Sequence, residues 1–391
     1  MMLRQTTAAG QEAAALDADA LYVTGWGVVS PLGTGAEEFA VAFTEERDAL
    51  VDVTGMYEEK LPAEQAFALP DFQAEERLGR KGTRFFDRAT ALALIACDEA
   101  LRDTAITVTD ANRADVGLVL GTTSGSVKST SDFSRETITQ DRPYLVNPVL
   151  FPNAVMNCAA GQAAIWFGLK GVNTTIAGGR MAQLAALRYA ARSLSWGDVD
   201  TLLVGAVEEF SPHSAWLSHL ADGPAPVGEG AAVFVVERGA ALARTDRRPE
   251  AEILAVATGS ADPEDRPSFV AAFANCVRQV LARAGVAAQD LWALSPGSGP
   301  AAQARAAHRE PEVEHEVLAL VLGDTDGPDA PVRLPVTRLV GDCGAAQGGM
   351  QLAAVLAHHR RSAALDGRPA LITSCTADGA FGATVVRGWQ R

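Results

Sequence analysis

The chain has 391 residues and a formal charge of −15 at pH 7, so it is long enough for a large core and too acidic for a nucleic-acid surface, which requires clustered Lys and Arg. No apolar run is long enough to span a bilayer, and residues 1–20 lack the order of a signal peptide, so we expect a cytoplasmic protein without membrane contact. The cysteines are odd in number and form no CxxC pair, so we expect free thiols, no disulfide framework, no metal and no cofactor. They are Cys97, Cys158, Cys276, Cys343 and Cys375.

Short runs of β-branched residues that end in glycine turns alternate with alanine-rich stretches along the chain. This alternation is typical of βαβ units and predicts an α/β fold with a largely parallel sheet. The predicted strands are Leu21–Trp26, Val116–Leu120, Thr201–Val204, Ala232–Glu237, Ala251–Ala257, Trp292–Leu294, Ala370–Ser374 and Ala383–Val386. The predicted helices are Arg84–Asp103, Met181–Ser195, Pro267–Ala284 and Gly348–Arg361.

The order of these segments repeats. In the first half a strand ends at the turn Gly121–Gly125, a helix begins near Met181, and two strands close the unit. The second half contains the same series: the strand and turn Ala293–Gly299, the helix after Cys343, and two final strands. We therefore predict two copies of one α/β unit. The alternation of strands and helices alone does not identify the fold, because many folds share it.

Several motifs resemble the ketosynthase branch of the thiolase-fold family, and they extend from Leu21 to near the end of the chain. The stretches that carry the resemblance are Val23–Gly33, Phe151–Ile165, Gly168–Gly171, Asp198–Glu208 and Gly228–Ala232. The resemblance implies a thiolase-like α/β fold, in which two related βαβ-type halves form a layered α-β-α-β-α core. It implies an N-terminal extension over residues 1–20, expected to be disordered, a first half with dimer-interface insertions over 21–250, and a second half over 251–391.

An active ketosynthase needs a cysteine nucleophile at a helix N-terminus and two histidines that stabilise the decarboxylating malonyl thioester, with a lysine supporting the second histidine. Aligned with the nucleophile turn of the family, this chain has Arg180 where the cysteine belongs, and arginine stays protonated and cannot be a nucleophile. The resemblance places Pro296 and Asp342 at the two histidine positions and Thr337 at the lysine position. Because all four positions are degenerate, we expect no catalytic residue among them.

The resemblance is closest to the chain-length factor, the inactive ketosynthase beta subunit of type II polyketide synthases. Such a subunit forms a heterodimer with an active ketosynthase and shapes the acyl tunnel that controls polyketide chain length. The stretch Glu208–Trp216 also resembles these subunits. Acyl carrier proteins are generally acidic, so we expect one to dock mainly on the partner rather than on this acidic chain. Chain-length factors often carry glutamine, linked to decarboxylative priming, at the nucleophile position; Arg180 gives no support for that activity.

A second class of function stays open from the sequence. A divergent ketosynthase-like acyltransferase or condensing enzyme could use a relocated cysteine, either Cys343 or Cys375, although no histidine lies close to Cys343 in the sequence to activate it. A homodimeric pseudoenzyme that binds a small ligand is a third option, which no motif favours. The adjacent His358 and His359 have no third ligand nearby, and we interpret them as a solvated helix end.

The guanidinium of Arg180 requires a nearby anion, because a cation close to a helix N-terminus faces the positive end of the helix dipole. In the family the nucleophile and the second histidine lie side by side, so we predict that Arg180 pairs with Asp342 and fills the former active site. The alternatives are that Arg180 faces solvent or pairs with Glu208 or Glu209. Loss of the Asp342 carboxylate from a fully buried pair would cost roughly 3–5 kcal/mol.

The resemblance assigns the control of chain length to the helix after the turn at Gly125, which in this family crosses the dimer interface and borders the partner's acyl pocket. The i, i+3, i+7 spacing puts Thr130, Phe133 and Thr137 on one face of that helix. Phe133 is then either a size gate, with the threonines lining the path, or ordinary interface packing. The full set that we assign to the substrate tunnel or interface is Thr130, Phe133, Thr137, Phe151 and Met156.

Overall fold

The computed structural model describes residues 16–222, 226–298, 310–323, 325, 327–328 and 330–390. Residues 1–15, which make up most of the expected N-terminal extension, lie outside the described residues, as does Gly299 of the second glycine turn. No helix in the described part of the chain is long and apolar enough to cross a membrane.

The first half of the chain forms five neighbouring strands in the order β6-β5-β7-β8-β1. Strand β5 (Val116–Thr122) lies between β6 (Asn173–Ala177) and β7 (Thr201–Glu208) and is parallel to both. Strand β8 (Gly230–Arg238) is antiparallel to β7 and to β1 (Leu21–Ser30). Among the residues that the structure describes, strand β6 therefore has a neighbouring strand on one side only.

The second half repeats this order and these directions, with β11-β10-β12-β13-β9. Strand β10 (Ala293–Pro296) is parallel to β11 (Val332–Arg333) and β12 (Pro369–Cys375). Strand β13 (Ala380–Gly388) is antiparallel to β12 and to β9 (Ala251–Ser260). A short antiparallel pairing of β1 with β9 joins the two half-sheets. The identical topology confirms the predicted repeat.

Helices cover and separate the two half-sheets. In chain order they are α1 (Ala36–Thr44), α2 (Ala74–Leu78), α3 (Arg88–Asp103), α4 (Val127–Thr139), α5 (Cys158–Phe167), α6 (Ala182–Trp196), α7 (Pro212–Asp222), α8 (Gly239–Leu242), α9 (Arg266–Ala284), α10 (Glu310–Leu322), α11 (Val336–Val340) and α12 (Gln347–Arg361). Three short strands complete the regular structure: β2 (Gly33–Thr34), β3 (Val51–Asp52) and β4 (Gln65–Ala66).

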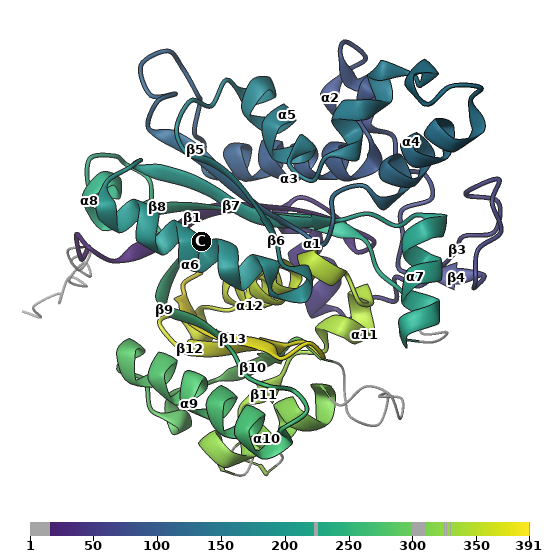
Figure 1. The fold of residues 1–391 in the computed structure, drawn as a ribbon. Coiled ribbons are helices and arrows are strands. Elements are labelled where there is room, and N and C mark those ends of the chain that lie inside the picture. The colour runs from purple at the N-terminus through teal and green to yellow at the C-terminus, as the bar shows by residue number, and fades with distance from the viewer. Residues whose placement is uncertain are drawn as a thin grey trace, which may run out of the picture.

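The elements stack in five layers (Figure 1). Helices α3 and α5 cover the outer face of the first half-sheet, and α9 and α10 cover the outer face of the second. Helices α6 and α12 lie between the two half-sheets and contact strands of both. The expected α-β-α-β-α core is therefore confirmed.

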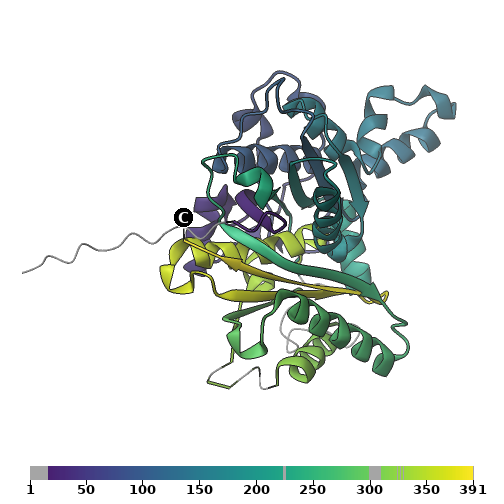
Figure 2. The ribbon, with the colours of Figure 1, turned by 90° about the vertical axis from the view of Figure 1, so that its left-hand side faces the viewer.

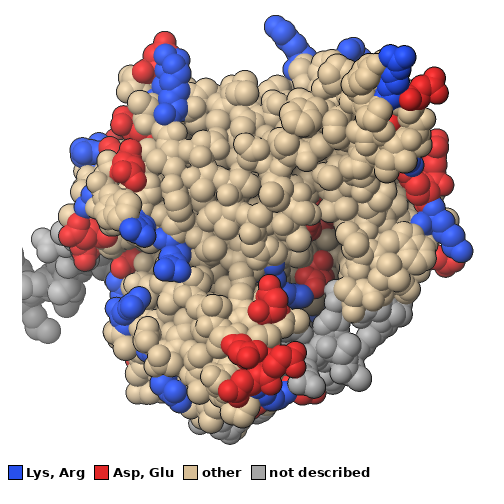
Figure 3. All heavy atoms as spheres, viewed as in Figure 1, with Lys and Arg blue, Asp and Glu red and all other residues tan. Residues whose placement is uncertain are grey.

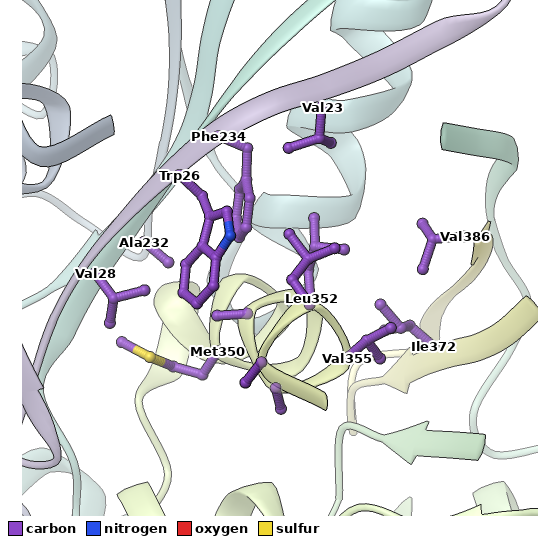
Figure 4. Close-up of a cluster of buried hydrophobic side chains, with 14 of the residues drawn as sticks. Val23, Trp26, Val28, Ala232, Phe234, Met350, Leu352, Val355, Ile372 and Val386 are labelled. Atoms are coloured by element: carbon purple, nitrogen blue, oxygen red, sulfur yellow. The ribbon is translucent and has the colours of Figure 1, made fainter. Parts of the chain in front are cut away.

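Helix α12 is buried along most of its length, because sheet covers it on two sides and α6 lies beside it. Figure 4 shows its apolar side chains among those of β1, β8, β12 and β13. The side chains labelled there are Val23, Trp26, Val28, Ala232, Phe234, Met350, Leu352, Val355, Ile372 and Val386. Burying one such Leu or Val side chain contributes roughly 1.5–3 kcal/mol.

Two glycines at the start of α12 permit this close packing. A Cβ atom on Gly348 would lie 2.9 Å from Cβ of Gln183 in α6, and one on Gly349 would lie 2.8 Å from Cβ of Ala232 in β8. Any larger residue at either position would push the central helices and β8 apart, which explains why this part of the helix is built from small residues.

All eight predicted strands are present, and so are the four helices predicted from the alternation and the helix expected after the turn at Gly125, with ends displaced by a few residues. Strands β6 and β11 were not predicted. The five residues of β6, Asn173–Ala177, include an asparagine and two threonines and do not form an apolar run. Strand β11 contains only Val332 and Arg333 and is too short to give a pattern.

The prediction that His358 and His359 form a solvated helix end is wrong. His359 is fully buried, and its Nε2 accepts a hydrogen bond of 3.2 Å from Nε1 of Trp292. Both imidazole rings contact the Trp292 ring, and His358 also contacts Phe43. Burial lowers the pKa of His359 to about 4, so this imidazole is neutral at pH 7.

We predict that acid destabilises the fold through His359. Its pKa is about 4 when folded and 6.5 in an ordinary environment, so the unfolded chain takes up the proton first and stability falls as the pH drops from about 6.5 to about 4. The free energy of unfolding of wild type and of His359→Gln is measured by urea denaturation. The difference between the two should fall by about 2 kcal/mol between about pH 7 and about pH 5. A difference between wild type and His359→Gln that stays constant over this pH range would contradict a buried neutral imidazole.

Candidate functional site

Three turns from the two halves of the chain meet at the N-terminal ends of the central helices. Residues Gly179–Met181 form a short 3-10 turn between β6 and α6, and Gly344–Ala346 form the equivalent turn before α12. These two turns contact each other. The third turn follows β10 and contains Gly297 and Ser298. The repeat of the fold thus brings corresponding turns together at one site.

Arg180 connects these turns. Its Nη2 atom lies 2.5 Å from Oδ2 of Asp342, and its Nη1 donates a hydrogen bond of 2.9 Å to the carbonyl oxygen of Gly297. The predicted pairing of Arg180 with Asp342 is confirmed. The side chains of Arg180 and Asp342 are 24% and 35% exposed, so the pair is only partly buried.

Local backbone geometry fixes Asp342. Gly341 and Gly344 have φ angles of 72° and 48°, in the left-handed region that glycine adopts without strain. This turn allows the backbone N–H of Gly344 to donate to Oδ1 of Asp342 at 3.0 Å, while Oδ2 faces Arg180. A Cβ atom at Gly344 would lie 2.5 Å from the Glu208 carboxylate, so glycine is also required for space.

Two further carboxyl groups, Glu208 and Glu209 at the end of β7, hold neighbouring turns. The Glu208 carboxylate accepts hydrogen bonds from the Thr123 hydroxyl and, at 2.9 Å, from the backbone N–H of Ala345. Burial raises the pKa of Glu208 to about 7, and the nearby Asp342 carboxylate adds to the shift. Arg180 forms its ion pair with Asp342, and none joins it to Glu208, so the alternative pairing of Arg180 with Glu208 is wrong.

The carboxylate of Glu209 points to the start of α4. It accepts hydrogen bonds from Oγ of Ser126 at 3.0 Å and from the backbone N–H of Lys128 at 3.1 Å. Burial raises the pKa of Glu209 to about 7. Glu209 therefore fixes the first turn of α4, and the alternative pairing of Arg180 with Glu209 is also wrong.

Of the other two predicted positions, one borders the Arg180 site and one lies behind it. Pro296 ends β10 opposite Thr373, directly before the Gly297 carbonyl that Arg180 contacts. The Thr337 hydroxyl accepts a hydrogen bond of 3.1 Å from Nε2 of Gln347, the first residue of α12.

Sequence reasoning missed Glu314. Its buried carboxylate accepts from the backbone N–H groups of Gly297 and Ser298 at 3.2 and 3.0 Å, and so holds the turn whose carbonyl Arg180 contacts. Glu314 lies in α10, a helix that was not predicted, and no local motif marks it.

The cysteines offer no accessible thiol. Cys343 is fully buried, and its Sγ lies 3.2 Å from the carbonyl oxygen of Val340. Burial raises the pKa of Cys343 well above its ordinary value, and the carboxylates of Asp342 and Glu229 add to the shift. Cys375 is 1% exposed. A catalytic cysteine must form a thiolate and reach its substrate, so this geometry argues against the relocated-cysteine alternative.

The five residues assigned to the tunnel or interface lie in one segment, residues 127–156, which we call the arm. It contains α4 and two 3-10 turns, Pro143–Leu145 and Pro148–Ala154. No residue of α4 is buried. In Figure 2 the arm projects from the right-hand side of the body. It thus has little contact with the core of its own subunit.

Contacts within the arm follow the predicted face of α4. The rings of Phe133 and Phe151 have centroids 5.7 Å apart, and the Thr130 hydroxyl is 3.3 Å from the carbonyl oxygen of Ala154. The Thr137 hydroxyl donates to the Ser134 carbonyl at 2.6 Å. Met156 ends the arm and is 52% exposed.

The arm continues into a nearly uncharged surface. Between residues 143 and 179 the only charged side chain is that of Lys170. Figure 3 shows the charged groups near the edges of this face, while the middle, over β6 and α5, is free of them. Large apolar side chains are exposed here: Tyr144, Leu145, Val149, Phe151, Val155, Met156 and Ile165. We call residues 143–179 the apolar face.

The doubled α/β unit, with a site between the helix starts of its two halves, defines a thiolase-fold protein. The model of the family described as "Beta-ketoacyl synthase, N-terminal domain" matches residues 18–241. The chain therefore belongs to the beta-ketoacyl synthase family. Among curated relatives, the 3-oxoacyl-[acyl-carrier-protein] synthase 2 of Vibrio harveyi is 27% identical over 191 residues, which are 49% of this chain. The match spans about half of that enzyme, 46% of its length.

Two solved structures are similar over nearly the whole chain. The ishigamide ketosynthase/chain length factor is 39% identical, with a TM-score of 0.82 over 95% of this chain and 99% of that one. The ketosynthase complex AntDE:AntF, which contains a type II PKS acyl-carrier protein and a ketosynthase bound to the hexaketide, is 17% identical. Its TM-score is 0.74 over 94% of this chain and 99% of that one, and at this identity the likeness shows the fold alone.

We predict that loss of the Asp342 charge destabilises the protein less than it would if the ion pair with Arg180 were fully buried. Because both side chains are partly exposed, Asp342→Ala should lower the free energy of unfolding by about 1–2 kcal/mol rather than 3–5. Asp342→Asn removes the charge alone, because its amide oxygen can still accept the hydrogen bond from the Gly344 N–H. In a double-mutant cycle with Arg180→Met, measured by urea denaturation, the coupling should be about 1 kcal/mol.

The exposed pair Arg338 and Glu46 provides a matched control, with side chains 45% and 57% exposed. The same cycle there should give a coupling below about 0.5 kcal/mol. Zero coupling between Arg180 and Asp342 would contradict a stabilising contact between the two halves.

Proposed function

We propose that this chain is a catalytically inactive ketosynthase-like subunit, a chain-length factor, which binds an active ketosynthase and helps to set the length of the acyl chain made by the pair. The observation that carries this proposal is Arg180, held by Asp342 and the Gly297 carbonyl at the turn that starts α6. The resemblance puts the nucleophile of an active ketosynthase at this position. A guanidinium fixed there supplies neither a nucleophile nor a base.

Among the described residues, the groups next to Arg180 supply no substitute for the missing catalytic residues. Pro296 and Asp342 occupy the positions that the resemblance assigns to the two histidines, and Thr337 occupies that of the lysine. Glu208 and Glu209, two nearby carboxyl groups with a raised pKa, are held by hydrogen bonds to adjacent turns. The site therefore supports a structural role for these residues.

The apolar face and the edge strand β6 support a heterodimer. Exposed side chains such as Ile165, 77% exposed, and Phe151, 56% exposed, cost free energy in water and are typical of a surface that a partner covers. Strand β6 has hydrogen-bonding groups on its outer side that a strand of a partner could pair with. The ishigamide ketosynthase/chain length factor, 39% identical, joins the two kinds of subunit named in its description.

Control of chain length is assigned to the arm. Phe133 and Phe151 pack together on its surface, and the Phe133 side chain is partly buried. At a dimer interface this aromatic pair would border a passage between the subunits, and its size would limit how far an acyl chain extends. An acyl carrier protein would then dock mainly on the partner, since this chain carries a charge of −15. The cytoplasmic location stays a prediction from the sequence.

We predict that Ile165→Asp abolishes the heterodimer. A carboxylate on the exposed end of α5 would have to be desolvated in the apolar face, where residues 143–179 offer the single cation Lys170. Co-expression with the partner ketosynthase followed by size-exclusion chromatography measures the complex. Leu320→Asp is a matched control, because Leu320 is 55% exposed on α10, away from this face. A heterodimer that survives Ile165→Asp would contradict the proposed interface.

We predict that Phe133→Ala lengthens the products of the heterodimer. Removal of the ring leaves Phe151 without its aromatic neighbour and widens the proposed passage, so chains should extend by at least one further unit before release. Product lengths from the reconstituted synthase are compared by mass spectrometry. Ile138→Ala, at an 83% exposed position on the same helix, serves as control. If Phe133→Ala left the product profile unchanged and the heterodimer intact, Phe133 would be an ordinary interface residue and not a size gate.

A further inference from the structure

One side of α6 carries two arginines and two aromatic residues that face solvent. Arg188, Arg192 and Trp196 are spaced four residues apart, which puts them on one side of the helix, and Tyr189 lies beside them. All four side chains are exposed, Tyr189 by 38% and Trp196 by 65%. We call these four residues the α6 stripe.

The two guanidinium groups of the stripe are held in place without a carboxylate. Nη1 of Arg188 donates a hydrogen bond of 2.8 Å to the Thr258 hydroxyl near the end of β9, and Cζ of Arg192 lies 4.1 Å from the centroid of the Trp196 ring. In the part of the chain that the structure describes, neither arginine forms an ion pair, whereas Arg360 binds two carboxylates. Both positive charges are therefore available to a partner.

The α6 stripe borders the apolar face. Helix α6 contacts β6, the edge strand of that face, and Figure 3 shows Lys and Arg side chains over α6 on the same side of the molecule as the uncharged middle. A surface with an apolar middle and charged groups at its rim has the composition of a protein–protein interface. A subunit that covers the apolar face would thus reach the stripe.

The stretch of chain that builds both surfaces contains no carboxylate. Between residues 143 and 197 there is no Asp or Glu, and the cations are Lys170, Arg180, Arg188 and Arg192. Arg180 is paired with Asp342 of the second half. The whole chain, by contrast, has a charge of −15. The sign of the charge is therefore reversed at the surface that a partner would cover.

An acidic protein surface is the partner that this arrangement fits. A second copy of this chain that docked through the same surface would bring further cations and no carboxylate, because an isologous interface joins identical patches. Nucleic acid would be repelled by the overall charge of −15. Carboxylates on a different subunit would satisfy both arginines while its apolar side chains cover the middle of the face.

We propose that the α6 stripe binds acidic side chains at the rim of the active ketosynthase. The inference rests on the proposed function and adds the chemistry by which this chain selects its partner. Each guanidinium forms charge-assisted hydrogen bonds with a carboxylate of the ketosynthase. Tyr189 and Trp196 supply rigid contact area around these bonds, as aromatic residues commonly do at interfaces.

The test is the dissociation constant of the purified heterodimer, measured by mass photometry after dilution in about 50 mM and in about 1 M NaCl. The double variant Arg188→Glu/Arg192→Glu should raise this constant at least about tenfold at the lower salt concentration. The difference from wild type should shrink severalfold in about 1 M NaCl, where the Debye length is about 3 Å.

A matched control is the reversal of an exposed arginine on the outer layer. Arg278 lies on α9, and its Nη2 donates to the Leu320 carbonyl of α10. Arg278→Glu should leave the dissociation constant unchanged, whereas Arg192→Glu alone should raise it about threefold or more. Arg188→Lys/Arg192→Lys keeps both charges and should retain most of the affinity.

Three results would overturn the inference. If the double charge reversal leaves the dissociation constant unchanged, or raises it equally at both salt concentrations, charge on α6 does not select the partner and the proposed function stands. If the heterodimer is unaffected but acyl transfer from the carrier protein to the partner slows, the stripe binds the acidic carrier protein instead. If the wild-type chain forms no heterodimer, or pairs only with itself, the proposed function itself fails.

Discussion

Helix α12 lies between the two half-sheets and beside α6, and the position of every turn at the candidate site follows from that packing. The small residues Gly348 and Gly349 allow α12 to approach α6 and β8 closely. The starts of α6 and α12 then lie next to each other, which brings together two turns that are far apart in the chain.

At this site the chain retains the architecture of a ketosynthase-like fold while an internal salt bridge occupies the place where chemistry would be expected. Arg180 holds Asp342 in one half and the Gly297 carbonyl beside Pro296 in the other. The adjacent carboxyl groups of Glu208 and Glu209 fix the turns on either side, including the first turn of α4. The site thereby links the core to the arm. Under the proposed function, the position that aligns with the nucleophile of the family stabilises the part of the subunit that faces its partner.

The duplicated α/β fold could be predicted from the sequence because buried strands of valine, leucine and alanine give clear patterns, and the same series occurs twice. Edge strand β6 escaped prediction because its threonines and asparagine carry no such pattern. The pairing of Arg180 with Asp342 could be predicted from charge and the family arrangement, but its exposure could not, since that depends on how the turns pack. Nothing in the local sequence marks Glu314 or the buried environment of His359, because residues distant in the chain create both.

Acyl loading of each subunit tests the central claim most directly. The heterodimer would be incubated with an acyl-charged carrier protein, and the intact mass of each chain would then be measured. Our account predicts an acyl adduct on the partner ketosynthase and none on this chain, because Arg180 cannot form a thioester and both Cys343 and Cys375 are buried. An acyl adduct on this chain would contradict the inactive-subunit account, and mapping it to a cysteine would identify the nucleophile.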